Sequence, residues 1–76
     1  MAGTLELRPT LRLLRVSRGK TLGAVAAEVG VSRRTLMRWE AGKTRPHVDQ
    51  ARRLAEAYGV SVDDIASLVR AEGRAG

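Results

Sequence analysis

Four neighbouring side chains in the middle of the chain have the chemistry and the spacing to read the edges of DNA bases. At about 100° per residue, an α-helix through this segment places all four within an arc of roughly 140°. A guanidinium can donate two hydrogen bonds to O6 and N7 of guanine, and an apolar group can contact a thymine methyl group. The predicted base-contacting residues are Arg33, Arg34, Met37 and Arg38.

The opposite face of the same helix is apolar. Leu36 and Trp39 point about 160° away from the basic arc, so they are expected to anchor the helix to a core. For any single arginine of this segment, an ordinary solvated face is the alternative. The local charge excess favours a binding surface, because residues 33–45 contain five Lys and Arg residues against Glu40 alone.

Two short helices joined by a very short link are predicted to position this face. Thr21 is a suitable N-cap for the first helix, and Ser32 for the second. Gly30 supplies the positive φ that a tight turn between two steeply crossing helices requires. The pattern predicts a helix-turn-helix whose second helix, from about Arg33 to Glu40, enters the major groove of DNA.

Three further helices complete the predicted fold, an all-α domain of five helices. The first begins at Pro9 and stops at Gly19, and the last opens at a capping box in which Asp64 follows Ser61 by three residues. The fourth helix lies before Gly59 and is expected to bury a stripe formed by Val48, Ala51, Leu54, Ala55 and Tyr58. One domain is expected over residues 9–70, with a flexible arm at residues 1–8 and a frayed tail at residues 71–76.

The composition excludes several other classes of protein. The 76 residues carry a formal net charge of +6 and a pI near 11.3, which suits a polyanionic partner. With no Cys and one His, the chain lacks the side chains for disulfides and for thiolate metal ligands, and no motif in it resembles a nucleophile–base arrangement. It is therefore expected to be no enzyme and to need no metal or cofactor. No secretory signal or membrane-spanning segment is recognised, so a cytoplasmic location is expected.

Three segments of the chain resemble the lambda-repressor-like, Cro/XRE-type helix-turn-helix family. They are LRLLRVSRG, AAEVGVSRRTLMRWEAGKTRP and AYGVSVDDI, and together they span Leu11 to Ile65, nearly three quarters of the chain. The string WEAGKTRP is the most specific part of the match. The resemblance implies a five-helix, lambda-repressor-like DNA-binding domain in which the second and third helices form the helix-turn-helix.

The resemblance also implies roles for individual residues. Positions that match Ser32, Arg33, Arg34 and Arg38 contact bases or adjacent phosphates in the family, and the Glu that matches Glu40 pairs with an arginine of the first helix, here Arg15. The predicted phosphate-contacting residues are Thr21, Ser32, Thr35, Lys43, Thr44 and Arg45.

One position departs from the family pattern. Leu22 stands where family members usually have a Gln that binds phosphate. Backbone amides at the start of this helix can still bind phosphate. Arg18 or Lys20 is expected to replace the missing side-chain contact.

The function predicted from these features is sequence-specific binding of double-stranded DNA by a small transcriptional regulator, a repressor that binds a palindromic operator as a homodimer. Residues left for self-association are Leu5, Leu7, Leu68, Val69 and Ala71. No membrane or small-molecule substrate is expected. The alternative is a protein-interaction module, of the antitoxin or anti-regulator type, that keeps the helix-turn-helix frame but binds an acidic protein partner.

Overall fold

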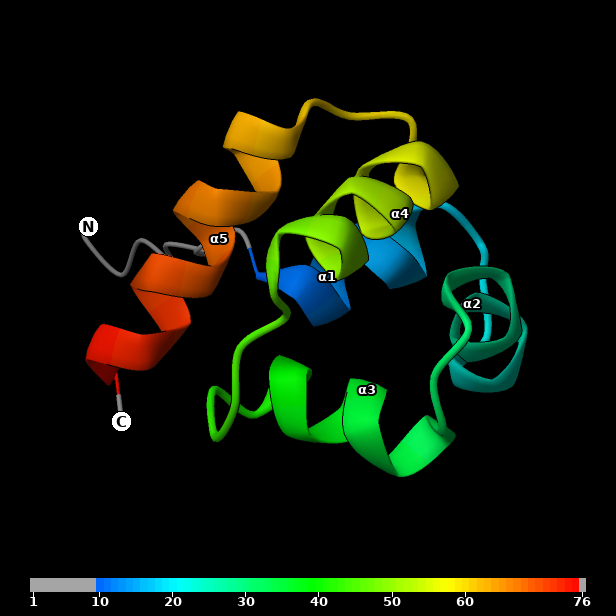
Figure 1. The fold of residues 1–76 in the computed structure, drawn as a ribbon, viewed down its shortest axis with the longest axis horizontal. Helices are drawn as coiled ribbons and strands as arrows, with labels where there is room; N and C mark the ends of the chain where they lie inside the picture. The colour runs from blue at the N-terminus through cyan, green and yellow to red at the C-terminus, as the bar shows by residue number, and fades with distance from the viewer. Residues whose placement is uncertain (1–9, 76) are drawn as a thin grey trace, which may run out of the picture.

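Five α-helices and no strand form the part of the chain that the structure describes (Figure 1). The computed structural model describes the backbone of residues 10–75 and the side chains of residues 10–70. The helices are α1 (Leu11–Ser17), α2 (Leu22–Val29), α3 (Arg33–Glu40), α4 (Val48–Tyr58) and α5 (Val62–Ala75). The predicted fold class, all-α with five helices, is therefore confirmed.

Side-chain hydrogen bonds to free backbone amides fix where the helices begin. The hydroxyls of Thr21 and Ser32 accept from the amides three residues later, each at 3.1 Å, as predicted. At α5, Ser61 and Asp64 form the predicted reciprocal capping box. Helix α1 begins at Leu11, two residues after the predicted start, because the Thr10 hydroxyl accepts from the Leu13 amide and makes Thr10 the N-cap.

The helices pack around one small core. Helix α4 lies between α2 and α5, while α1 contacts α3 and α5 (Figure 1). Helix α3 runs along the lower edge of this view and packs against α2 and α1. The buried apolar side chains come from all five helices and are Leu11, Val25, Ala26, Val29, Leu36, Trp39, Leu54, Ala55, Tyr58 and Ile65.

One prediction about the second half of the chain differs from the structure. Val48, predicted to point inward, is 68% exposed, because it is the first residue of α4 and borders an open groove rather than the core. Helix α5 extends to Ala75, and the fraying expected for residues 71–76 stays a prediction. Ala, Glu and Arg favour helix here, and a single Gly within a helix costs only about 1 kcal/mol. The predicted arm, residues 1–8, and Pro9 lie outside the described residues.

Candidate nucleic-acid interface

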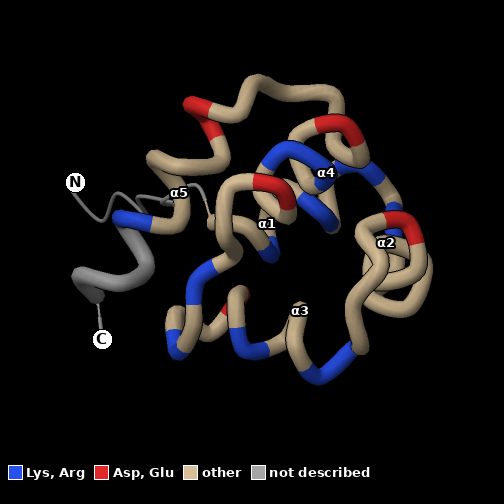
Figure 2. Tube along the Cα trace, in the orientation of Figure 1, with Lys and Arg blue, Asp and Glu red and all other residues tan. Residues whose placement is uncertain are grey.

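Helix α3 has one face in the core and one face in solvent. Leu36 and Trp39 are buried, whereas Met37 is 54% exposed and lies between exposed arginines. Figure 2 shows basic residues along α3 and in the segment that follows it. All four predicted base-contacting residues are therefore on the solvent face of one helix, whose orientation is held by two apolar side chains.

The turn between α2 and α3 is tightly hydrogen-bonded. Gly30 has φ 85° and its amide donates to the carbonyl of Ala26 at 2.8 Å, and the Val31 amide donates to the same carbonyl at 2.9 Å. Arg53 of α4 donates from Nη1 to the Val29 carbonyl at 3.2 Å. This contact was not predicted from the sequence. It ties the end of α2, and hence the start of α3, to the body of the domain.

The segment after α3 folds back onto the end of the helix. The amides of Lys43 and Thr44 donate to the Arg38 carbonyl at 2.9 and 3.5 Å, and Gly42, with φ 73°, permits the reversal. Lys43 is thereby held beside the exposed face of α3. A shallow depression of about 330 Å³ is lined by Arg34, Met37, Arg38, Ala41 and Lys43.

The other predicted phosphate-contacting residues lie in three places. Thr21 and Ser32 are exposed N-caps of α2 and α3, and the Ser32 hydroxyl donates to Thr35 Oγ1 at 3.0 Å. Thr44 lies in the segment that folds back onto α3. Arg45 lies apart from them, because it lines a groove between α4 and α5.

Arg15 and Glu40, expected as an ion pair, lie together between α1 and the end of α3. The Arg15 guanidinium donates from Nε to Glu40 Oε2 at 2.7 Å and from Nη2 to Oε1 at 3.3 Å, while Nη1 donates to the Lys20 carbonyl at 3.0 Å. The two side chains are only 11% and 8% exposed. Glu40 is therefore neutralised from inside the domain, and the forked geometry fixes α3 against α1.

This buried charge pair also affects ionisation. The hydrogen bond to Glu40 raises the pKa of the Arg15 guanidinium above its ordinary value, so the guanidinium stays charged. Burial, assisted by the nearby Glu40 carboxylate, raises the pKa of Tyr58 to about 12. The Tyr58 hydroxyl is buried and has no hydrogen-bond partner among the described residues.

The two residues expected to replace the missing Gln contact at Leu22 make contacts within the domain. Arg18 donates from Nε to the Tyr58 carbonyl at 2.8 Å, and the Lys20 ammonium pairs with Glu28 at 3.2 Å, so both expected substitutes for the missing Gln are engaged within the domain. Arg33 is the side chain that approaches this helix end. A Cβ added at Gly23 would lie 3.4 Å from Arg33 Cδ and 3.9 Å from its Nη1.

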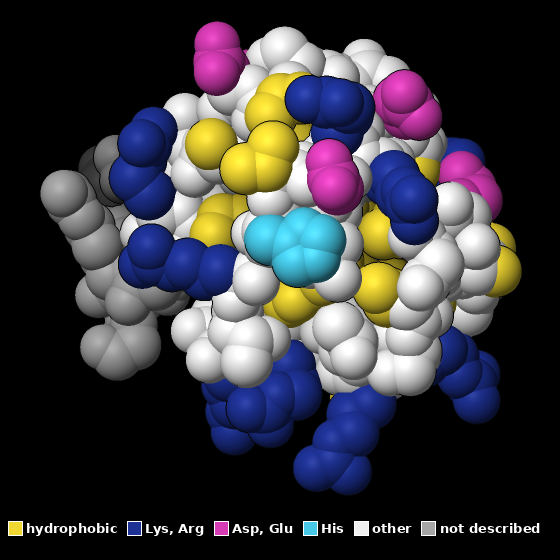
Figure 3. Space-filling view, in the orientation of Figure 1, with side chains coloured by type: hydrophobic (Ala, Val, Ile, Leu, Met, Phe, Trp, Pro, Cys, Tyr) yellow, Lys and Arg dark blue, Asp and Glu magenta, His cyan; other side chains and the backbone are white. Residues whose placement is uncertain are grey.

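Charge is unevenly distributed over the surface. Figure 3 shows dark blue side chains gathered along the lower edge, beneath α3, and magenta side chains on the upper half. The acidic residues of α4 and of the start of α5 are Asp49, Glu56, Asp63 and Asp64. Within the described part of the chain, the solvent face of α3 thus presents positive charge without exposed carboxylates that would repel phosphate.

The described residues offer neither a metal centre nor a membrane anchor. Among them, no group of three or more His, Cys, Asp or Glu side chains is placed to hold a metal ion. None of the described helices is long and apolar enough to cross a bilayer.

The family model for a helix-turn-helix domain matches residues 6–68, so the chain belongs to the helix-turn-helix domain family. This agrees with the resemblance to Cro/XRE-type proteins, and it places the chain in a class of DNA-binding domains that are typically not enzymes. No curated protein and no solved structure matches the chain significantly.

Proposed function

We propose that this protein is a transcriptional regulator that binds double-stranded DNA in a sequence-specific manner by inserting α3 into the major groove. The observation that carries the proposal is the solvent face of α3. Arg33, Arg34 and Arg38 are exposed there, and none of them has an ion-pair partner among the described residues. A recognition helix needs donors that are free to bind bases on a helix that does not move.

Within this proposal, two arginines and the methionine read bases. Arg34 and Arg38 bind guanine with paired hydrogen bonds, and Met37, exposed between them, contacts a thymine methyl group. They line one depression together with Lys43, which supports a common binding partner for all four side chains.

The remaining contacts fix the domain on the phosphate backbone. Thr21, Ser32, Thr35, Lys43 and Thr44 are assigned to phosphates, whereas Arg45 is not, because it lines the groove between α4 and α5. Arg33 joins them, because its side chain lies against Gly23 at the start of α2, where amide groups favour an anion. Arg33 thereby replaces the phosphate contact that Leu22 cannot make. It remains able to reach a base edge at the margin of the groove.

The regulator is further proposed to be a repressor that binds a palindromic operator as a homodimer. Helix α3 has only eight residues, so one copy reads few base pairs, and two half-sites about one helical turn apart increase specificity. Leu13 of α1 is an exposed apolar side chain available for self-association. Leu68 and Val69 pack partly against the core, and the side chains of Leu5, Leu7 and Ala71 lie outside the described part.

Selection from randomised duplex DNA tests the proposal directly. The expected result is an enriched, guanine-containing palindrome bound at least about 1,000-fold more tightly than scrambled DNA at physiological salt. Sedimentation of the complex should show two copies per palindrome. Weak binding that disappears as salt rises, with no enriched motif, would contradict specific recognition and leave an acidic protein as the better partner for α3.

A further inference from the structure

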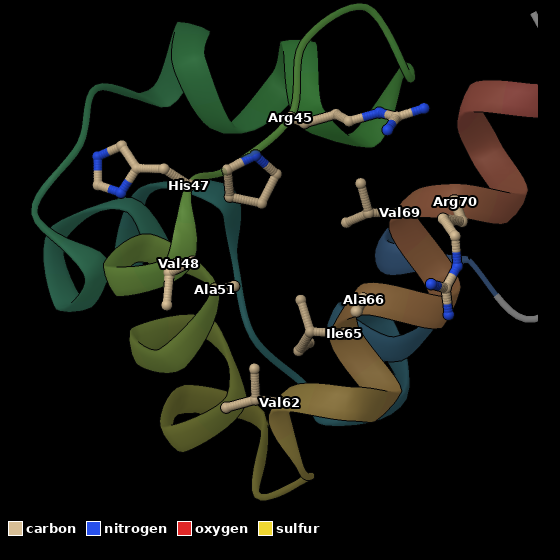
Figure 4. Close-up of a pocket in the computed structure, with 10 residues that line it drawn as sticks. Arg45, His47, Val48, Ala51, Val62, Ile65, Ala66, Val69 and Arg70 are labelled. Carbon is tan, nitrogen blue, oxygen red and sulfur yellow. The ribbon is translucent and has the colours of Figure 1, made fainter.

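A second surface of the domain has the composition of a binding site but is not part of the α3 face. It is a groove of about 250 Å³ between the start of α4 and the outer side of α5 (Figure 4). Val48 and Val62, 68% and 39% exposed, stand at its edges, and Ala51, Ala66 and Val69 also line it. In Figure 3 the same region is a group of hydrophobic side chains on the face turned toward the viewer.

Two arginines border this apolar groove. Arg45 extends from the segment before α4 toward α5, above Val69, and Arg70 projects from α5 nearby (Figure 4). Among the side chains that the structure describes, none that lines the groove is acidic. Within residues 10–70, neither guanidinium has an ion-pair partner or a side-chain hydrogen bond, so both are available to a ligand.

We propose that this groove binds a short segment of a protein partner in which apolar side chains are flanked by Asp or Glu. The apolar side chain of such a segment occupies the space between Val48 and Val69, and its carboxylates pair with Arg45 and Arg70. The groove lies away from the solvent face of α3, so the partner can bind the groove while α3 binds DNA. This interaction adds to the proposed DNA binding and does not depend on it.

Other occupants fit the groove less well. The volume of about 250 Å³ is below the range of about 300–1,000 Å³ typical of small-molecule sites, but it accommodates an anchoring side chain. DNA phosphate would satisfy the guanidiniums and leave the valines exposed to water. A second copy placed symmetrically would bring Arg45 and Arg70 of both copies to one patch, with no carboxylate in the lining to offset the repulsion.

The test starts from a library of random dodecapeptides displayed on phage and selected against the intact chain. Enriched peptides are then synthesised with a fluorophore, and their affinity is measured by anisotropy. The expected peptides combine acidic and large apolar residues. Arg70→Glu and Val48→Asp should each weaken them by at least about tenfold, because each change removes one half of the proposed recognition.

Matched variants separate this groove from general attraction to a basic protein. Arg52→Glu on α4 and Val16→Asp on α1 make the same chemical changes at exposed positions outside the groove, and should leave peptide affinity within about twofold. Arg34→Glu should likewise spare the peptide while it impairs DNA binding. Arg70→Glu should do the reverse, so failure of this site and failure of the proposed DNA binding give different results.

Three results would overturn the assignment. The first is a library without an acidic, apolar consensus, and the second is a consensus whose binding is lost in Arg34→Glu rather than in Arg70→Glu. The third is a concentration-dependent dimer of the free protein that Val48→Asp dissociates, which would assign the groove to a second copy of the chain.

Discussion

Two sides of α3 use arginine in opposite ways. On the inner side, Arg15 is nearly buried and all of its donating nitrogens have partners in Glu40 and the Lys20 carbonyl. On the outer side, Arg34 and Arg38 are exposed and have no ion-pair partner among the described residues. The same functional group thus stabilises the fold where it is enclosed and remains available to a ligand where it is not.

The Arg15–Glu40 pair also affects the charge of the DNA-binding surface proposed on α3. Glu40 follows closely after Arg38 on α3, and a free carboxylate there would repel DNA phosphates. Its pairing with Arg15 removes that charge from the binding surface and holds the helix in the same contact. Positioning and electrostatics are therefore coupled through one ion pair.

The largest expected effect comes from breaking that pair. Arg15→Met should destabilise the domain by about 3–5 kcal/mol, because it leaves the enclosed Glu40 carboxylate without a partner. The double variant Arg15→Met/Glu40→Met should cost less than Arg15→Met alone, since no charge is then left unpaired. Urea denaturation of both variants and of Glu40→Met completes a double-mutant cycle.

Arg15→Lys offers a milder version of this experiment. It keeps the charge but loses the forked geometry, so it should fall between the wild type and Arg15→Met. If each single variant instead lost less than about 1 kcal/mol of stability, and the two losses simply added in the double variant, the pair would be an ordinary surface pair. That result would contradict a structural role.

A smaller effect is expected on the outer side of α3. Arg34→Ala should lose about 1–3 kcal/mol of discrimination at a single guanine and change stability by no more than about 0.5 kcal/mol. Affinities for the selected site and for its single-base variants provide the measurement, with Arg52→Ala as a control on α4. Equal weakening at every base would show that Arg34 binds phosphate and would contradict its assigned role.

Lys43 sharpens the distinction between reading and anchoring. Lys43→Ala should weaken all sequences alike and reduce the slope of log affinity against log salt by about one. Titrations at three or more salt concentrations, with specific and scrambled DNA, measure both quantities. A loss confined to the specific site would move Lys43 into the base-reading group.

The sequence predicted this arrangement well where a local pattern determines it. Caps at Thr21, Ser32 and Ser61 and the turn at Gly30 depend on residues a few positions apart, and all are present in the structure. The two faces of α3 follow from helical periodicity in the same way.

Contacts between distant segments of the chain were harder to predict from the sequence. Arg53 and Arg18 bond to the last carbonyls of α2 and α4, 24 and 40 residues away in the chain. A helical stripe also placed Val48 in the core, but only the packing of α5 decides how far that stripe is covered. An arginine has no sequence signature that says which carbonyl it will meet, although cations near helix C-termini are generally favourable.

Tyr58 contrasts with Arg15, because its buried polar group has no hydrogen-bond partner among the described residues. Its buried hydroxyl makes no hydrogen bond within the described part, so Tyr58→Phe should leave stability unchanged at pH 7 or raise it by about 1 kcal/mol.

Burial raises the folded-state pKa of Tyr58 to about 12, above the ordinary value of 10.0. The unfolded chain therefore loses its proton first, and the wild type should lose stability as pH rises from 10 through 12. Because other groups titrate there too, the informative quantity is the difference between wild type and Tyr58→Phe, which should grow in favour of the variant. A marked loss of stability in Tyr58→Phe at pH 7 would mean that the Tyr58 hydroxyl has a hydrogen-bond partner, such as an enclosed water. The hydroxyl would then be hydrogen-bonded in the interior, as the Arg15–Glu40 pair is.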